Sequence, residues 1–225
     1  MGLAARREGE LRRIQASLGA TCDIHPCDVR DLASIGDAAR AFMAKRGAPD
    51  IVIGNAGISH GTLTELAEDA ATFREILDVN VLGLVHTFQP FVAAMRARGS
   101  GRLAGIASVA GFRGLPGASA YSASKAAAIA YLEALRVELR PSGVLVTTLC
   151  PGYIRTPMTA ANPYPMPFLI DADDAARQLA RAIDAGKRFA VVPWQMALVG
   201  ALLRAVPDVL YDRLAARAGR KPRRA

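Results

Sequence analysis

Short apolar runs alternate with longer segments of helical periodicity along the whole chain. The short runs predict strands at residues 20–26, 50–53, 102–107, 144–149 and 189–192. The longer segments predict helices over residues 7–18, 31–46, 69–98, 119–140 and 172–186, and a further helical segment after residue 192. Apolar runs too short for helices, separated by helix-length segments, are typical of βα units and of a parallel sheet buried on both faces. The sequence therefore predicts an α/β fold with a three-layer, doubly wound parallel sheet.

Composition favours one folded domain in a reducing compartment. The 225 residues are 52% hydrophobic and 6% aromatic, which suits an α/β core packed from Ala, Val and Leu. Cys22, Cys27 and Cys150 have neither a CxxC nor a metal-ligand spacing, so we expect reduced core thiols and no metal site. Arg6 and Arg7 interrupt the N-terminus before an apolar signal region forms. These features predict a cytoplasmic protein.

The net charge of +8 is concentrated at one end of the chain. Residues 213–225 contain no acid and six basic residues, namely Arg213, Arg217, Arg220, Lys221, Arg223 and Arg224. The rest of the chain is close to neutral, and no basic stripe crosses the predicted domain. We therefore expect no nucleic-acid partner.

Candidate ligand-binding residues follow two predicted strands, at the edge where open parallel sheets bind ligands. Asn55-Ala56-Gly57 comes directly after the strand at 50–53, and its small residues permit close approach of the backbone to a ligand. Ser108 comes directly after the strand at 102–107. Each feature alone is also typical of an ordinary turn or a helix cap.

Tyr121 and Lys125 are the most specific candidates for catalysis. Residues i and i+4 lie on one face of a helix, so the phenol and the ammonium are neighbours in the helix at 119–140. A tyrosine is a poor acid or base near neutrality, and a cation one turn away favours its phenolate and lowers its pKa. The alternative is a surface Tyr–Lys pair, because this spacing is common by chance.

Five motifs in a fixed order resemble the short-chain dehydrogenase/reductase family. They are Asn55-Ala56-Gly57, Asp78-Val79-Asn80-Val81, Ser108 thirteen positions before Tyr121, Tyr121-xxx-Lys125, and Pro151-Gly152-Tyr153-Ile154-Arg155-Thr156. The resemblance runs from residue 1 to about residue 192, and residues 193–225 form a C-terminal apolar helix and basic tail. It implies a Rossmann-like domain and a nicotinamide-dependent enzyme that interconverts a carbonyl and a secondary alcohol.

The resemblance also implies the roles of individual residues. Tyr121 would transfer the proton to or from the reacting oxygen, and Ser108 would hydrogen-bond the same oxygen. Lys125 would lower the pKa of the tyrosine and hold the nicotinamide ribose. Asn80, in the long helix, would hold a water that links Lys125 to solvent.

The implied cofactor-binding residues come from the ends of several strands. Asp28 and Val29 would contact the adenine ring. The ribose and pyrophosphate would be lined by Asn55, Ala56 and Gly57, and the nicotinamide would be covered by Pro151, Gly152, Ile154 and Thr156.

The choice of cofactor depends on the residues after the family's second strand, where an acid binds the ribose 2′-hydroxyl and an Arg accommodates a 2′-phosphate. Leu3-Ala4-Ala5-Arg6-Arg7 resembles the end of that strand, with Ala5 where an acid would stand and Arg6 beside it. We therefore predict NADP(H) rather than NAD(H). The alternative is that Arg6 and Arg7 only begin a solvated helix.

One family feature is missing from this sequence. Neither GxxxGxG nor GxGxxG, the glycine-rich turn that cradles the pyrophosphate, occurs ahead of residue 28. The resemblance therefore implies an N-terminally truncated sheet, whose first βα unit would precede Met1. Either the working protein starts earlier, or the chain is truncated and impaired. The intact Asn–Ser–Tyr–Lys set favours the first explanation, and a non-catalytic Rossmann-like binding or scaffold protein is the alternative of a different class.

Substrate and partners are indicated only weakly by the sequence. Residues 158–168, the family's substrate lid, are apolar and Pro-rich and contain no cation, which favours a hydrophobic ketone or alcohol unless they only pack the loop. The apolar residues 193–203 beside a basic tail suit peripheral membrane contact, a subunit interface, or packing on their own domain. The family's habit implies a homodimer or homotetramer.

Overall fold

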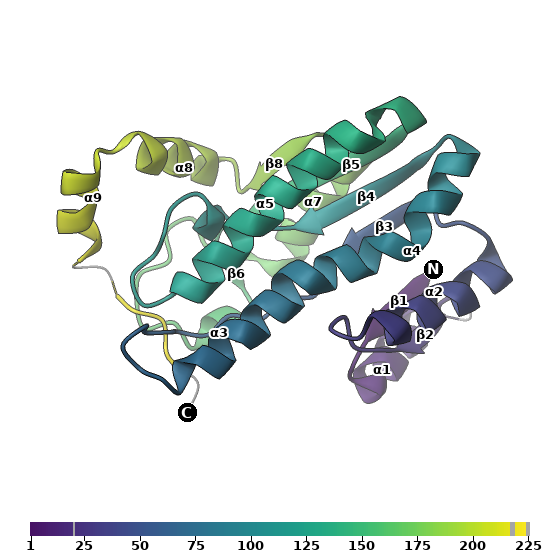
Figure 1. Ribbon diagram of the computed structural model, residues 1–225, viewed down its shortest axis with the longest axis horizontal. Coiled ribbons are helices and arrows are strands. Elements are labelled where there is room, and N and C mark those ends of the chain that lie inside the picture. Colours follow the sequence, from purple (N-terminus) through teal and green to yellow (C-terminus); the bar gives the residue numbers. More distant parts are fainter. Residues whose placement is uncertain (20, 217–218, 224–225) are drawn as a thin grey trace.

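The computed structural model describes residues 1–19, 21–216 and 219–223 (Figure 1). Its strands are β1 Gly2–Ala5, β2 Asp23–Pro26, β3 Ile51–Gly54, β4 Gly101–Ile106, β5 Val144–Pro151, β6 Ile154–Arg155, β7 Ile170–Asp171 and β8 Phe189–Val192. The five predicted strands correspond to β2, β3, β4, β5 and β8, while the short strands β6 and β7 were not predicted. The α-helices are α1 Glu8–Leu18, α2 Leu32–Arg46, α3 Asp69–Leu77, α4 Gly83–Arg98, α5 Ser119–Leu139, α6 Pro157–Ala160, α7 Ala172–Asp184, α8 Gln195–Ala205 and α9 Asp208–Ala215. Two 3₁₀ turns, η2 Val109–Gly111 and η3 Arg140–Ser142, flank α5, and a π turn, η1 Asp78–Leu82, joins α3 to α4.

Four parallel strands form the central sheet in the order β3-β4-β5-β8. Gly54 is opposite Gly105, and Ile106 is opposite Leu149, so the carboxyl ends of these strands meet at one edge. Backbone hydrogen bonds extend this edge, from the amide of Ala107 to the carbonyl of Leu149 and from the amide of Gly152 to the carbonyl of Val192. The predicted α/β fold is confirmed, and the residues after each strand lie at a common edge.

Helices cover both faces of the central sheet. On one face, Phe88 of α4 and Leu132 of α5 pack with Leu103 and Val146 in the main core. On the other face, the side chains of α7 pack on β4 and β5 in a smaller cluster. Glycine in the strands permits this close packing, because a Cβ on Gly54 would lie 2.3 Å from Leu84 Cδ1. The result is the predicted three layers (Figure 1).

The long segment from α3 to α4 differs from its prediction. The sequence predicts one continuous helix over residues 69–98, whereas the structure inserts the π turn η1 at its middle. This segment is long and apolar enough to cross a membrane by length and composition alone. Its contacts with β3, β4 and α5 identify it instead as a core helix of the α/β domain.

The strands β1 and β2 form a separate parallel pair, beyond the edge of the central sheet. Among the described residues, β1 is hydrogen-bonded to β2 but not to β3. Ile51 and Ile53 are 39% and 50% exposed along β3, as expected at an open strand edge. The pair is attached through α2, which packs on α4, and through His86 Nδ1, 2.8 Å from the carbonyl of Val29. The predicted doubly wound sheet is therefore divided into two sheets between β1 and β3.

The C-terminal helices lead the chain back to the start of α3. In Figure 1 the yellow segment after α9 descends past the loops at the sheet edge and ends near α3. The amide of Gly61 donates to the carbonyl of Pro222 over 2.8 Å, and Gly61 and Arg223 form a parallel β-bridge. The apolar helix predicted after residue 192 is present as α8, but the described part of the basic tail packs on the domain. Arg217 and Arg224 lie outside the described residues.

The divided sheet predicts unequal stability in the two parts. Amides in β1 and β2 should exchange with solvent at least about tenfold faster than amides in β4 and β5, because a two-stranded sheet attached through one helix opens independently. Native-state hydrogen exchange of the whole chain, corrected for intrinsic rates, measures this difference. Equal protection in β1 and β4 would instead mean that both sheets open as one cooperative unit.

Candidate active site

The structure brings together the four predicted catalytic side chains from three elements. Ser108 follows β4, Tyr121 and Lys125 lie in the first turns of α5, and Asn80 belongs to the π turn η1. Asn80, Ser108 and Lys125 are buried, at 2%, 7% and 4% exposure. Polar side chains are rarely buried without a specific arrangement of partners. Their partners therefore define the site.

Lys125 has its ammonium buried against the end of β4. Its Nζ donates to the carbonyl of Ile106 over 2.8 Å and lies 5.8 Å from the centroid of the Tyr121 ring. Among the described residues, no carboxylate forms an ion pair with it. Burial disfavours the charged form and lowers the pKa of Lys125 to about 8.

Asn80 is fixed by hydrogen bonds to the loop after β3 and to α5. Its Oδ1 accepts from the amide of Ile58 over 2.8 Å, and its Nδ2 donates to the carbonyl of Ile58 over 3.0 Å. The same Nδ2 donates to Ser124 Oγ over 2.9 Å, and Ser124 Oγ donates to the carbonyl of Tyr121 over 2.7 Å. The π turn, a feature often found at functional sites, thus ties the loop at residue 58 to the helix that carries Tyr121.

Ser108 caps the short turn η2 and interacts with Tyr121. The amide of Ala110 donates to Ser108 Oγ over 3.1 Å, and the hydroxyl donates to the carbonyl of Pro151 over 3.4 Å. Burial of the phenol raises the pKa of Tyr121, and a hydrogen bond from Ser108 opposes this effect. The expected lowering of this pKa by Lys125 is therefore wrong for the protein alone, because burial disfavours the phenolate more than the neighbouring groups favour it.

A narrow polar cradle lies beside Lys125 and Asn80 at Gly57. A Cβ on Gly57 would lie 3.3 Å from Asn80 Oδ1 and 3.6 Å from Lys125 Nζ, so this position has room for little more than glycine. In the same loop, the buried hydroxyl of Ser59 has no hydrogen-bond partner among the described residues. A partly accessible glycine, an ammonium and an unpartnered hydroxyl fit the hydroxyl groups of a ribose. The residues predicted for the nicotinamide half of a dinucleotide therefore fit that group.

The predicted nicotinamide cover lies at the carboxyl end of β5. Pro151 ends the strand, and a Cβ on Gly152 would lie 2.6 Å from Met196 Cγ, so α8 packs directly on this turn. Ile154 belongs to β6, which pairs with β7, and Thr156 caps α6 through its contacts with Thr159. The predicted lid over residues 158–168 thus contains part of α6, followed by an irregular segment.

The predicted adenosine half is less complete. Arg30, which was not predicted from the sequence, donates hydrogen bonds to Asp28 from Nε over 3.0 Å and from Nη2 over 2.6 Å. The pair lowers the pKa of Asp28, chiefly through these hydrogen bonds, and the exposed Arg6 contributes its charge. Val29 contacts Gly83 at the start of α4. The sequence does contain a signal for this ion pair, since Arg30 stands two positions after Asp28 at the end of β2.

The loop Asn55-Ala56-Gly57 provides only part of the expected pyrophosphate contacts. Ala56 is exposed, and so is Asn55. Its side chain makes no hydrogen bond to any described residue, because it follows the open edge of β3. Ahead of Asp28, no described strand is followed by a glycine-rich turn of the kind that binds a phosphate at a helix N-terminus.

A second feature missed from the sequence is the position of the basic tail. Lys221 Nζ lies 5.7 Å from the centroid of the Tyr121 ring, and the described part of the chain holds it close to the predicted catalytic residue. Nothing in the local pattern of residues 213–225 indicates this contact, which depends on the path of α8 and α9.

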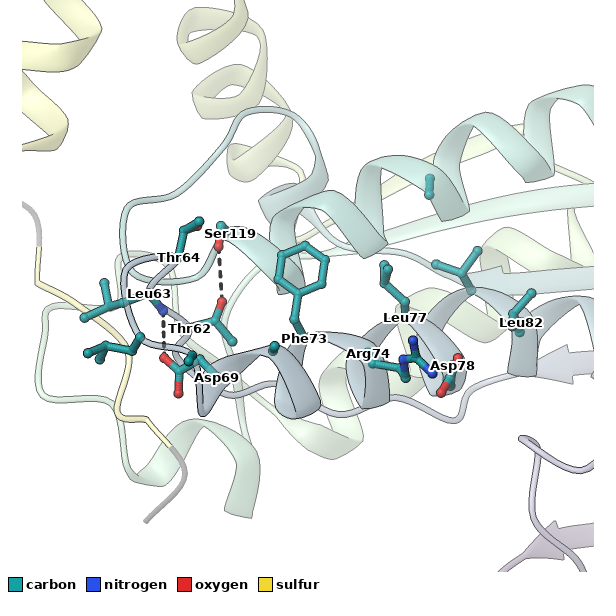
Figure 2. Close-up of a pocket in the computed structure, with 15 residues that line it drawn as sticks. Thr62, Leu63, Thr64, Asp69, Phe73, Arg74, Leu77, Asp78, Leu82 and Ser119 are labelled. Atoms are coloured by element: carbon teal, nitrogen blue, oxygen red, sulfur yellow. Dashed lines mark hydrogen bonds between the residues drawn. The ribbon is translucent and has the colours of Figure 1, made fainter.

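An apolar groove lies outside this site (Figure 2). It is a groove of about 740 Å³ between α3, η1 and α5, and its walls are mainly apolar, with Phe73, Leu77 and Leu82 among them. Thr62 and Ser119, hydrogen-bonded to each other at 3.1 Å, lie at one end. Ser108, Tyr121 and Lys125 do not line it. The groove is thus a surface between helices, separate from the cluster of candidate catalytic residues at the sheet edge. No cluster of metal-ligating side chains occurs among the residues that the structure describes.

Comparison with known proteins identifies the family of this chain. The family described as short chain dehydrogenase matches residues 1–165. An uncharacterized oxidoreductase from Myxococcus xanthus is 36% identical over 95% of this chain and 85% of its own length. A dehydrogenase/reductase SDR family protein 7-like from Anopheles gambiae is 39% identical over 70% of this chain, which spans only 52% of that relative. The structure of a 3-ketoacyl-(acyl-carrier-protein) reductase from Brucella melitensis, complexed with NADH, has a TM-score of 0.77 and 26% identity, covering 84% of this chain and 83% of that one.

The buried ammonium predicts that Lys125→Met stabilises the protein. A fall in pKa from 10.5 to about 8 corresponds to at most about 3 kcal/mol of destabilisation at pH 7, less about 1 kcal/mol for the lost hydrogen bond to Ile106. Between pH 8 and 10.5 the unfolded chain binds more protons at Lys125 than the folded chain, so wild-type stability rises with pH. The advantage of the variant should therefore shrink over that window.

Urea unfolding at pH 7, 9 and 10 measures this difference, with the exposed Lys187→Met as the matched control. Titration of Tyr121 is common to wild type and variant and cancels in the comparison. Destabilisation by Lys125→Met at pH 7, independent of pH, would show that the ammonium is not penalised by burial.

Proposed function

Because this chain belongs to the short-chain dehydrogenase/reductase family of oxidoreductases, we propose that it interconverts a carbonyl compound and a secondary alcohol with a nicotinamide cofactor. The fold is a Rossmann-like arrangement of parallel strands, and family members bind NAD(P)(H). The observation that carries the proposal is the cluster of Asn80, Ser108, Tyr121 and Lys125 around the end of β4. These residue types in this geometry suit proton transfer to an oxygen beside a ribose.

In this proposal the bound nicotinamide supplies the hydride chemistry, and the protein supplies position and protons. Tyr121 donates its phenolic proton to the carbonyl oxygen during reduction and accepts it during oxidation. Ser108 donates a hydrogen bond to the same oxygen and stabilises the charge that develops there. Pro151 and Gly152 cover one side of the cofactor, while Ile154 and Thr156 hold the start of the lid.

The raised pKa of Tyr121 suits an acid rather than a base at neutral pH. A buried phenol stays protonated, which is the form that reduction requires. Lys125, with its pKa near 8, remains largely charged at pH 7 and lies close enough to titrate in the working range. It is a positioning and proton-exchange group, and Asn80 holds the loop and helix around it.

We further propose that the substrate has an apolar body and that NADP(H) is preferred. The lid residues from Met158 to Phe168 contain no cation, which favours an apolar contact surface. Arg6 is exposed directly after β1. Ala5 occupies the position where an acid would repel a 2′-phosphate, and it carries no charge. Arg30 is already engaged by Asp28, so Arg6 is the available cation for a 2′-phosphate.

We also propose that the protein works in the cytoplasm and that it self-associates. The apolar groove between α3 and α5 suits self-association as a homodimer or homotetramer, since Leu82 remains 48% exposed beside it. Trp194, Leu198 and Leu202 form an exposed stripe along α8, which suits a subunit or a membrane surface. The fold-back of Lys221 and Arg223 argues against the membrane, because these tail cations contact the domain instead.

A non-catalytic scaffold protein is the alternative, and the incomplete pyrophosphate site favours it. The separation of β1 from β3 coincides with the place that the family resemblance gives to a central βα unit. Retention of all four catalytic positions in one cluster favours the enzyme.

Substitution of the tyrosine tests the mechanism. Tyr121→Phe should lower kcat for a panel of aliphatic and aromatic ketones by at least about a hundredfold, because it removes the general acid. Its thermal stability and its binding of NADPH should change little, since only one hydroxyl is lost. Turnover is followed by NADPH absorbance at coenzyme concentrations in the millimolar range, with Tyr131→Phe on the same helix as the control. Activity that persists in Tyr121→Phe would remove the proposed mechanism.

Coenzyme preference is tested separately by Arg6→Gln. The wild-type chain should have a Michaelis constant for NADPH at least about tenfold below that for NADH, and Arg6→Gln should remove most of this difference. The adjacent Arg7→Gln should leave the preference unchanged. We also expect this 225-residue chain to bind NADPH weakly, with a dissociation constant above the micromolar range, because the pyrophosphate contacts are few. A clear preference for NADH, or micromolar binding of NADPH in a fluorescence titration, contradicts these expectations.

A further inference from the structure

The C-terminal residues 219–223 pass over three loops at the carboxyl edge of the sheet. A Cβ on Gly219 would lie 2.6 Å from Tyr164 Cβ in the lid, and one on Gly117, before α5, would lie 3.0 Å from Arg220 Cβ. A Cβ on Gly61, after β3, would lie 2.3 Å from the carbonyl oxygen of Lys221. We call residues 219–223 the strap. Glycine lies at each close approach, so the surrounding loops accommodate the strap closely.

The strap is anchored by an ion pair at its last described residue. Arg223 Nε and Nη2 contact Asp69 at 2.9 and 3.0 Å, and Nη2 also donates to Glu68 over 2.9 Å. Asp69 is only 6% exposed, and it accepts a further hydrogen bond from the amide of Leu63 over 2.8 Å. These hydrogen bonds, led by that from Arg223, lower the pKa of Asp69. A carboxylate held this firmly is a fixed attachment point at the start of α3.

Lys221 is carried by the strap to the proton-donating tyrosine. Its ammonium lies 5.7 Å from the centroid of the Tyr121 ring, and Lys125 lies 5.8 Å from the same centroid. Partial burial lowers the pKa of Lys221. No acid among the residues that the structure describes forms an ion pair with it.

A partly desolvated ammonium with no acidic partner is costly to maintain. Arg223, two positions further along, has two carboxylates, so the tail does not lack acids within reach. The Lys221 ammonium instead lies over the ring of Tyr121, the residue proposed to exchange a proton with the substrate oxygen. The group that would complete this arrangement is an anion carried by the ligand.

We propose that Lys221 binds an anionic group of the substrate, so that the substrate class is an oxo or hydroxy compound with a carboxylate or phosphate near the reacting carbon. This inference rests on the proposed function and deepens it. The lid residues contain no cation, and the charge complementary to the substrate comes from the far end of the chain instead. One substrate can meet both proposals, with its apolar body against the lid and its anionic group at Lys221.

Direct binding tests the inference without turnover. Acetoacetate, levulinate and 5-oxohexanoate are compared with their methyl esters by ligand-observed NMR, with the whole chain in millimolar NADP⁺. Acetonyl phosphate serves as the phosphate arm and distinguishes the two anionic groups. At least one anion should bind the wild type at least about tenfold more tightly than its neutral counterpart, and Lys221→Met should remove this preference. Lys187→Met is the matched control, because Lys187 is exposed and lies before β8, at the opposite end of the strand from the site.

A second variant and a kinetic readout complete the test. Arg223→Gln, which releases the anchor, should weaken binding of the anion but not of the ester. In turnover assays, Lys221→Met should raise KM for the anionic ketone at least about tenfold and leave kcat, and both constants for the ester, nearly unchanged. Tyr121→Phe should lower kcat at least about a hundredfold yet keep the preference for the anion in binding.

The outcomes separate the two proposals. Charge-dependent binding without turnover would refute the proposed function but support the role of Lys221. Turnover of ketones without preference for any anion, or an unchanged preference in Lys221→Met, overturns the inference alone. Faster turnover of neutral and anionic ketones alike in Lys221→Met would identify the side chain as a plug and also overturn it.

Discussion

The buried ammonium of Lys125 is the constraint on which the rest of the site depends. It is 4% exposed, and its hydrogen-bond acceptor is the carbonyl of Ile106 at the end of β4. Burial of a charge without an acidic partner is unfavourable unless the surrounding elements hold polar groups in place. The carbonyl of Ile106 is the polar group that contacts the ammonium, while the π turn directs Asn80 to the loop after β3 and to Ser124 of α5 and so fixes the elements around it. Gly57 follows from the same constraint, because any side chain there would occupy the space beside Lys125 and Asn80.

This arrangement connects the architecture to the chemistry. Parallel strands end at one edge, so β4 places Ser108, and β5 places Pro151, beside the helix that carries Tyr121. The buried phenol remains protonated, and the nearby ammonium has its pKa close to 8, so the two groups can serve as proton donor and proton-exchange group. The strap then adds a second ammonium from a remote part of the sequence. Each feature depends on the tertiary fold, although the residues involved are individually common.

Much of the fold could be predicted from the sequence, because hydrophobic periodicity marks strands and helices wherever burial determines them. The strands at 50–53, 102–107, 144–149 and 189–192 were predicted in this way. The four candidate catalytic positions were implied by the resemblance of five motifs to the family, and their clustering depends on the fold. The π turn was missed, since its cause is the tertiary position of Asn80 rather than a local signal. The raised pKa of Tyr121 was missed because desolvation cannot be read from an i, i+4 pair. The contact of Lys221 with Tyr121 was missed because it depends on the path of α8 and α9. The pairing of Arg30 with Asp28 was missed although the two residues are only two positions apart.

Transfer of a labelled hydrogen tests the central claim most directly. The whole chain is incubated with NADPH deuterated at the transferred position of C4 and with a ketone from the panel, and the alcohol is analysed by mass spectrometry and NMR. The account predicts one deuterium on the carbinol carbon, with the hydroxyl proton supplied through Tyr121 and ultimately by solvent. Tyr121→Phe should form the labelled product at least about a hundredfold more slowly. Absence of label in the alcohol at saturating coenzyme, or equal labelling by Tyr121→Phe, would contradict it.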